Sequence, residues 1–298
     1  MHSERIHIME NKKICIATDC SCDLPTRMLK ENGIQVMYFY IRTERGCFRE
    51  GEEITAVNIF EYHNENSDRP AISLEPVAEE FYGFFTKQLT RFDEVIYITT
   101  GNKISMAYKN ATDSLPMLAK DGNDGRVHIF DSMHLSTGIG HLALYAARLA
   151  REGRNVQEII SGLEIMRPKI STTFMADSAD YLYRNGKVSK GLATLCRLLK
   201  FHPVLEMRDG KLKLIAVKVG AYESCAMRYV ACRLKKLGNV RKDLLFITHA
   251  GCTAADMKMV KGKVEERAYF DKIEVTSASA TISCNSGPRT FGLLYVNK

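Results

Sequence analysis

The sequence lacks the features that mark a membrane protein, a zinc protein or a nucleic-acid-binding protein. None of its apolar stretches approaches the ~20 residues of a membrane span, and residues 1–11 have neither the apolar core nor the cleavage site of a signal peptide. Cys20 and Cys22 are the only closely spaced cysteines, and no second pair follows at zinc-ligand spacing. The net charge of +7 is spread along the chain, with no basic run denser than Arg233–Lys236. We therefore expect no metal site, no nucleic-acid partner and no stable membrane insertion.

Proline and low-complexity sequence are also scarce. The chain has only 7 Pro, and its 45% hydrophobic and 26% charged residues are ordinary for a globular protein. Its nine cysteines are odd in number and irregularly placed, which is typical of a protein from a reducing compartment rather than of a disulfide framework. We therefore predict a cytoplasmic protein.

The motifs of common nucleotide-binding and hydrolytic enzymes are missing too. There is no Gly-x4-Gly-Lys-[Ser/Thr] string and no Gly-x-Ser-x-Gly string. A Gly-x-Gly-x-x-Ala string starts at Gly138, but it lies too far beyond the strand-like Val127–Phe130 for the tight turn of a dinucleotide site. A serine hydrolase would have to combine Ser105 with one of four histidines, none of which is selected by its spacing: His128, His134, His141 and His249. The sequence thus favours a binding protein over an enzyme, and one that has no cofactor.

The order of helix and strand patterns predicts an α/β protein with two domains, as the length of 298 residues also suggests. Strands separated by helices up to about residue 170 predict a mostly parallel sheet with helices on both faces. Beyond Ser171, hairpin signals such as Pro203–Met207 and Lys211–Val219 are mixed with helices, which predicts an α+β domain with a mixed or antiparallel sheet. Because Pro168 interrupts a helix, we place the domains at 12–169 and 170–298, with a flexible extension over 1–11.

One pattern recurs in the first half of the chain: an apolar strand is followed by a cluster of hydroxyl, carboxyl and glycine residues and then by a helix. The clearest clusters are Thr18–Asp23, Thr99–Ser105 and Asp131–Gly138, with a weaker one around Pro70–Ser73. Hydroxyls and N–H groups at the carboxyl ends of parallel strands usually hold an anionic head group. Asp19 and Asp131-Ser132, at the ends of two of the strands, are expected to bond loop N–H groups through their side chains. We therefore predict an anion site at this edge of the sheet.

A tight-turn signal, Asn285-Ser286-Gly287-Pro288, lies near the C-terminus between two apolar segments. It has two interpretations at this point. The segment is either a simple turn before the last strand, or a turn that brings Asn285 and Ser286 into a cleft between the two halves, where ligands often bind.

Several short motifs follow one another in a characteristic order. Thr18–Pro25 reads Thr-Asp-Cys-Ser-Cys-Asp-Leu-Pro, and Ile72-Ser73 and Ile104–Tyr108 follow it. The later motifs are Asp131-Ser132, Ser136–Gly140, Tyr181–Ser189, Pro203–Leu205 with Asp209-Gly210, Ile247–Ala250 and Gly287-Pro288. Over about residues 13–296, this ordered set resembles the DegV family of fatty-acid-binding proteins, which have the EDD fold and act as lipid-presenting subunits. Each motif is weak alone, and their order and spacing carry the resemblance.

The resemblance implies a protein that holds a long-chain fatty acid. It implies an acyl chain in an apolar tunnel of the first domain and a carboxylate that emerges between the domains. Bacterial members present the fatty acid to a separate fatty acid kinase, which is therefore the implied protein partner. The family's head-group ligands are a Thr and a Ser that fall here at Ile72 and Ser105. Ile72 cannot donate a hydrogen bond, so Ser73 is the expected substitute, and Asn285 stands where many members carry a His.

We thus predict a non-enzymatic fatty-acid-binding protein whose ligand residues are Ser105, Ser73, Ile72, Asn285, Ser286 and Gly287. The expected acyl-chain lining comprises Phe81, Phe84, Phe85 and Met106. Two alternatives of the same fold remain open. A small-molecule phosphotransferase would need a His or Asp that becomes covalently modified at a strand end, for which His134 is the best placed histidine. A regulatory interaction protein would show an exposed apolar patch and no internal tunnel.

Overall fold

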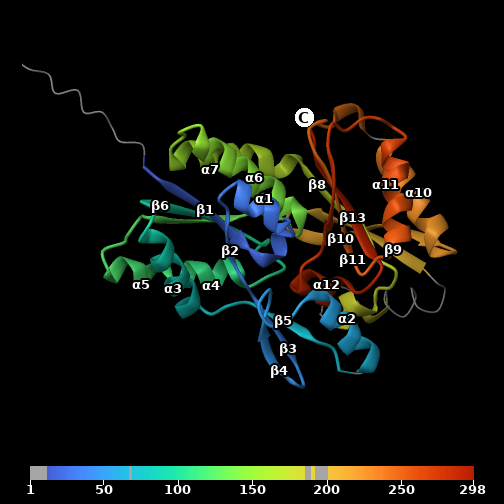
Figure 1. Cartoon of the computed structure of the whole chain (residues 1–298), viewed down its shortest axis with the longest axis horizontal. Helices are drawn as coiled ribbons and strands as arrows, with labels where there is room; N and C mark the ends of the chain where they lie inside the picture. The colour runs from blue at the N-terminus through green and yellow to red at the C-terminus, as the bar shows by residue number, and fades with distance from the viewer. Residues whose placement is uncertain (1–11, 67–68, 185–188, 192–200, 236) are drawn as a thin grey trace, which may run out of the picture.

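Two large sheets lie side by side in the computed structural model of the chain, and a small third sheet projects from between them (Figure 1). The structure describes residues 12–66, 69–184, 189–191, 201–235 and 237–298. Two of the predictions above fall outside these residues, the flexible extension over 1–11 and the middle of the motif at Tyr181–Ser189, as does a helix that the sequence pattern also predicts over Leu192–Lys200. Within the described residues, no helix is long and apolar enough to cross a bilayer.

The first sheet is entirely parallel, with the strand order β2-β1-β6-β7. Its strands are β1 (Ile14–Asp19), β2 (Gln35–Met37), β6 (Glu94–Thr99) and β7 (Val127–Asp131). Their side chains are buried on both faces, as expected for a sheet covered by helices on either side. The carboxyl ends of β1, β6 and β7 therefore lie at one edge, where the sequence places its hydroxyl clusters.

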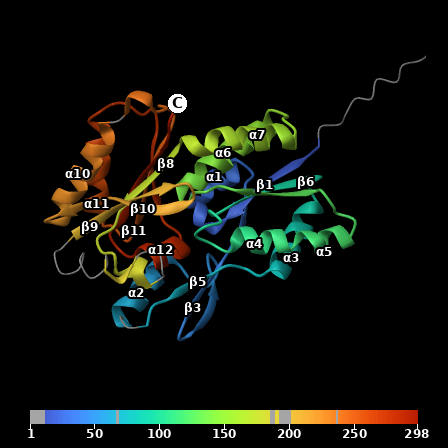
Figure 2. The ribbon, with the colours of Figure 1, turned by 180° about the vertical axis from the view of Figure 1, so that it is seen from behind.

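Helices cover both faces of this sheet, as predicted (Figures 1 and 2). One face packs against α1 (Thr26–Glu31), α6 (Thr137–Arg151) and α7 (Val156–Met166), and the other against α3 (Ala78–Leu89), α4 (Ala107–Asp113) and α5 (Leu115–Lys120). Successive side chains of a strand point to opposite faces of the sheet, so each face forms its own hydrophobic core. Ile96 and Ile98 face α1, α6 and α7, while Tyr97 faces α3, α4 and α5. Phe81 and Phe85 pack edge-to-face on Tyr97, with ring centroids 5.5 and 5.4 Å away.

The second sheet is mixed, as predicted, with the order β10-β9-β8-β13-β11-β12. Only β11 and β12 are parallel neighbours. The strands are β8 (Ile170–Met175), β9 (Phe201–Arg208), β10 (Lys211–Val219), β11 (Leu245–Ala250), β12 (Ile273–Ser277) and β13 (Thr290–Val296). Asp209 and Gly210 both have positive φ, 53° and 74°, so the β9–β10 hairpin uses the Asp-Gly turn that the sequence indicates.

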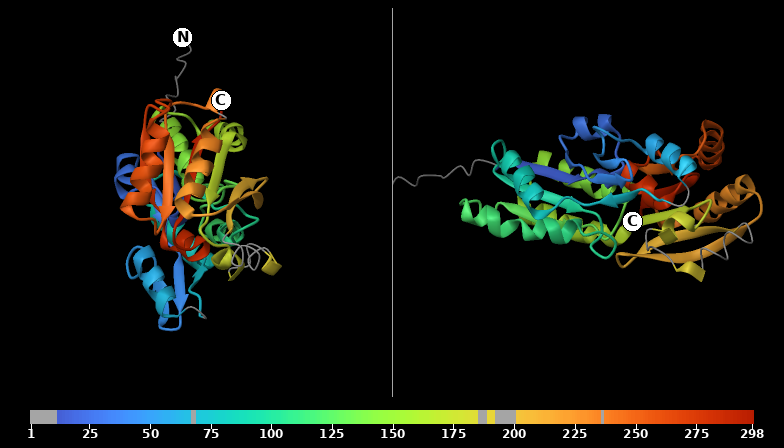
Figure 3. Two further views of the ribbon diagram at one scale, coloured as in Figure 1. Left: turned by 90° about the vertical axis from the view of Figure 1, so that its right-hand side faces the viewer. Right: turned by 90° about the horizontal axis from the view of Figure 1, so that it is seen from below.

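The helices α10 (Tyr222–Leu234) and α11 (Ala254–Glu265) cover this second sheet and lie at the end of the molecule far from the first sheet (Figure 3). A short helix, α8 (Asp180–Arg184), follows β8. The chain passes from the first sheet to the second around residues 167–170. The domain ranges 12–169 and 170–298 remain a prediction.

The small third sheet is absent from the sequence-based expectation. It consists of β3 (Tyr40–Thr43), β4 (Gly46–Arg49) and β5 (Ile72–Leu74) in the order β4-β3-β5. The sequence pattern predicts one strand over Gln35–Ile41, but this run is divided between β2 and β3, because Phe39 packs in the core under α3, α4 and α5 while Ile41 packs against α2 (Ala56–Glu65). One apolar run therefore serves two sheets.

The predicted turn at Asn285–Pro288 is instead the end of a helix, α12 (Ala280–Ser286), which was not expected. Ser279 caps its start by accepting a hydrogen bond from the Ile282 N–H at 3.2 Å. Gly287 follows the helix with φ 78°, a conformation that favours glycine. The helix lies where the two large sheets and the small sheet meet (Figure 1).

Candidate ligand-binding pocket

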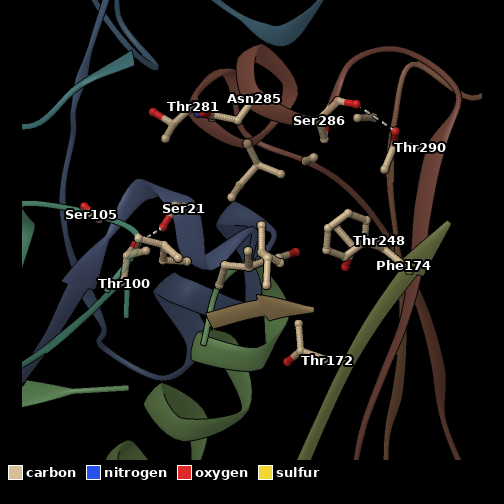
Figure 4. Close-up of a pocket in the computed structure, with 18 of the residues that line it drawn as sticks. Ser21, Thr100, Ser105, Thr172, Phe174, Thr248, Thr281, Asn285, Ser286 and Thr290 are labelled. Carbon is tan, nitrogen blue, oxygen red and sulfur yellow. Dashed lines mark hydrogen bonds between the residues drawn. The ribbon is translucent and has the colours of Figure 1, made fainter. Parts of the chain in front are cut away.

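A pocket lies between the two large sheets, bounded by α12. Its walls come from the segments after β1 and β6 on one side and from β8, β11 and β13 on the other. Figure 4 shows Ser21, Thr100 and Ser105 on one side of it, Thr172 and Thr248 on the other, and Asn285 on α12. The cavity has a volume of about 100 Å³. The pocket thus lies at the carboxyl edge of the parallel sheet, where the hydroxyl clusters predict a ligand site.

Asp19, at the end of β1, organises the hydroxyls at this edge. Its carboxylate accepts hydrogen bonds from the Thr100 N–H at 2.7 Å and the Thr100 hydroxyl at 2.9 Å, and from both the N–H and the hydroxyl of Ser21. Burial raises the pKa of Asp19 to about 6, because the charged form loses hydration. Asp131 likewise accepts from the N–H groups of Asn102 and Met133. Both aspartates therefore bond loop N–H groups, as predicted.

Ser105 lies just before α4 and is bonded to a carboxylate of the protein itself. Its hydroxyl donates to Glu75 Oε1 at 2.7 Å, and the Met106 N–H donates to the same oxygen at 3.2 Å. The Ala107 N–H in turn donates to Ser105 Oγ at 3.2 Å. Ser105 and Glu75 both line the pocket. The hydroxyl and N–H at the start of α4 thus form a donor pair that binds one carboxylate oxygen.

Ser73 and Asn285 meet across the pocket wall. Asn285 Nδ2 donates to Ser73 Oγ at 2.9 Å and to the Thr281 carbonyl oxygen at 2.8 Å, so it links β5 to α12. Ser286 also lines the pocket, and its buried hydroxyl has no hydrogen-bond partner among the described residues. A ligand or a water molecule could satisfy this group.

The remaining residues of the predicted site lie elsewhere. Ile72 is 38% exposed and does not line the pocket, and neither does Gly287. Met106 is 52% exposed. Phe81 and Phe85 are fully buried around Tyr97, so the acyl-chain lining expected from the α3 phenylalanines is not part of this pocket.

The apolar part of the pocket comes mainly from the second half of the chain. Phe174 on β8, Leu212 on β10, Ile282 on α12 and Leu294 on β13 line it. Gly292 on β13 also lines it, and a Cβ there would lie 2.6 Å from the Thr173 carbonyl oxygen, so the strand approaches closely only with glycine. The pocket therefore has hydroxyl groups on both sides, and most of its apolar side chains come from the second half of the chain.

Two buried carboxylates hold α12 against the first half of the chain. Glu50 accepts from the Ala280 N–H at 2.6 Å, the Thr281 N–H at 3.0 Å and the Thr281 hydroxyl at 2.6 Å. Asp23 accepts from the Ser279 N–H at 2.8 Å and the Ser136 hydroxyl at 2.6 Å, and burial raises its pKa to about 7. Acidic groups near a helix start are favourable because they offset the exposed N–H groups.

The histidine on which the phosphotransferase alternative depends is fully engaged. His134 Nδ1 lies 3.0 Å from Thr172 Oγ1, and Nε2 lies 3.0 Å from the Arg167 carbonyl oxygen. Burial lowers its pKa to about 4. Both ring nitrogens thus have structural partners, although the sequence indicates none. No group of three or more metal-ligating side chains occurs among the described residues.

These features define an α/β protein with a pocket between two sheets that is lined by hydroxyl and apolar groups. The family model described as "Uncharacterised protein, DegV family" matches residues 13–298. A DegV domain-containing protein of Caldanaerobacter subterraneus is 29% identical over 292 residues, covering 96% of this chain and all of that protein. The chain belongs to the DegV family.

Solved structures of DegV proteins have the same fold. A DegV family protein of Thermus thermophilus, described as binding fatty acid, superimposes with a TM-score of 0.85 at 22% identity, covering 96% of this chain and 100% of that one. A DegV family protein of Eubacterium eligens loaded with heptadecanoic acid gives a TM-score of 0.81 at 18% identity, again covering 96% and 100%. This likeness confirms the predicted fold.

Sequence reasoning missed several groups in the pocket wall. Thr281 and Ile282 lie on α12, of which the sequence indicates only the turn at its end, and Glu75 is a lone Glu before a proline, which carries no recognisable pattern. Thr172 and Thr248 lie on strands whose hydroxyls the sequence gives no reason to single out.

Proposed function

We propose that this protein binds a long-chain fatty acid in the pocket between the two sheets. The carboxylate lies at Ser105 and the Met106 N–H, and the acyl chain extends along Phe174, Ile282 and Leu294. Membership of a family with solved fatty-acid-binding members supports the proposal. The observation that carries it is the donor pair at the start of α4, which already holds one oxygen of a carboxylate.

The apolar wall accounts for the affinity that such a ligand requires. Each buried CH₂ group contributes about 0.8 kcal/mol, so a long acyl chain binds tightly without catalytic groups. The open space of about 100 Å³ is smaller than the roughly 300–1,000 Å³ of drug-sized ligand sites. Half-buried side chains such as Leu212 and Ile282 therefore move outward when the chain enters.

In this proposal, the bound fatty acid is presented to a separate fatty acid kinase. Met106, next to Ser105, is 52% exposed, and Val77, two residues beyond Glu75, is 53% exposed. Ile72, on β5, is also exposed, at 38%. In this proposal the kinase contacts these exposed apolar side chains, because apolar patches are typical of protein interaction sites.

Native mass spectrometry of the protein purified without added lipid tests the binding function. We expect an acyl-sized adduct on the wild type, a weaker one on Ser105→Ala, and an unchanged one on Ser161→Ala, a matched control at an exposed position of α7 (Val156–Met166). The absence of any adduct, even after incubation with hexadecanoate, would exclude the proposal.

A further inference from the structure

Glu75 occupies the donors that the proposed ligand would use. Its Oε1 accepts both the Ser105 hydroxyl and the Met106 N–H, and these are its only hydrogen bonds among the described residues. It forms no ion pair with any of those residues. The carboxylate of the protein therefore stands at the position of a ligand carboxylate.

The described lining of the pocket that Glu75 faces offers it no positively charged side chain. No Lys or Arg lines the pocket in the part of the chain that the structure describes. His249 is the only histidine of that lining, and burial lowers its pKa, which favours the neutral ring. A second carboxylate beside Glu75 would meet unscreened repulsion, because like charges a few ångströms apart in a partly buried site repel strongly.

We infer that Glu75 is an internal competitor that a fatty acid must displace from Ser105 and Met106 in order to bind. The inference rests on the proposed function. It makes Glu75 a residue that weakens acid binding and favours a ligand with a neutral head group. An alcohol of the same length can donate its O–H to Glu75 without displacing it, whereas a carboxylate cannot.

The backbone around Glu75 is fixed while its side chain is free to leave. Leu74 pairs with Tyr40 in the small sheet, and Asn110 Nδ2 donates to the Pro76 carbonyl oxygen at 2.8 Å. The Glu75 side chain itself is half-buried, and among the described residues its hydrogen bonds are those from Ser105 and Met106, just before α4. Rotation of the side chain toward solvent therefore requires no rearrangement of the strand or of α3.

Binding of hexadecanoate and hexadecanol by the full-length wild type and its variants tests this inference. Glu75→Gln removes the charge and keeps an acceptor for Ser105, while Glu75→Ala leaves the donors empty. Glu79→Gln is the matched control, because Glu79 is exposed on α3 and does not line the pocket. We expect the dissociation constant of hexadecanoate to fall about tenfold in both Glu75 variants, the effect of about one charge-assisted hydrogen bond. The control stays within twofold, and hexadecanol shows no comparable gain in any variant.

The outcomes separate this inference from the proposed function. If the wild type binds hexadecanoate and neither Glu75 variant binds it more tightly, Glu75 is a structural contact and the inference is wrong. An equal gain for hexadecanol would also overturn it, because the effect would then not depend on the head-group charge. If none of the proteins binds hexadecanoate, the proposed function fails and the inference fails with it.

Discussion

Glu75 lines the pocket and Asp19 lies behind it, bonded to the lining residues Ser21 and Thr100, and the two carboxylates differ in how the protein holds them. Asp19 is fully buried and accepts four hydrogen bonds, from the N–H and hydroxyl groups of Ser21 and Thr100. Glu75 is half-buried and accepts two. The first arrangement fixes the edge of the parallel sheet, whereas the second leaves a donor pair that a ligand can take over.

The largest expected effect is on stability, at the buried carboxylate. Asp19→Ala leaves the N–H and hydroxyl groups of Ser21 and Thr100 without their acceptor, so we expect a loss of about 3 kcal/mol in the free energy of unfolding. Glu75→Ala should cost less than about 1 kcal/mol, because its donors face the pocket and can bind water. Urea denaturation of both variants gives the two values, and equal losses would remove the distinction between the two carboxylates.

Filling the pocket should abolish binding with little change in stability. Ile282→Trp places a large side chain in a pocket with little open space, so we expect at least a hundredfold loss of affinity for hexadecanoate, measured by calorimetry. Ile165→Trp is the matched control, because Ile165 is 65% exposed on α7. Unchanged binding by Ile282→Trp would show that the acyl chain lies elsewhere.

Removal of one donor should have an intermediate effect. Ser105→Ala deletes a charge-assisted hydrogen bond to the ligand and keeps the Met106 N–H, so the dissociation constant for hexadecanoate should rise about tenfold. Titration of hexadecanol with the same variant should show a smaller change. A Ser105→Ala protein that binds both ligands as the wild type does would place the head group away from α4.

The buried aspartates predict a modest pH dependence of stability. Burial raises the pKa of Asp19 to about 6 and that of Asp23 to about 7, from an ordinary value of 3.8. The folded state thus favours the protonated forms of both aspartates. Their contribution to the free energy of unfolding is therefore complete below the ordinary pKa and is lost as the pH rises through 6 and 7. We expect this loss to be about 1–3 kcal/mol. Urea denaturation at pH 5 and pH 8 measures the loss, which should be smaller in Asp23→Asn. An identical loss in that variant would show that Asp23 does not contribute.

The elements with strong local patterns could be predicted from the sequence, and the pocket could be predicted only in part. Three strands of the parallel sheet, β1, β6 and β7, are apolar runs followed by helices, so a parallel sheet with helices on both faces follows from periodicity, whereas its strand order does not. By contrast, α12 is seven residues of small and polar side chains that end in a Gly-Pro turn. Its start is held by carboxylates more than 200 positions earlier in the chain, at Asp23 and Glu50, and a single sequence carries no signal for such long-range contacts.

A crystal structure of the protein with hexadecanoate bound tests the central claim most directly. We expect elongated density between α12 and the strands β8, β11 and β13, with the ligand carboxylate within hydrogen-bonding distance of Ser105 Oγ and the Glu75 side chain rotated away from α4. Density outside this pocket would contradict the proposed function. Hexadecanoate bound in the pocket while the Ser105–Glu75 hydrogen bond stays intact would contradict the displacement of Glu75.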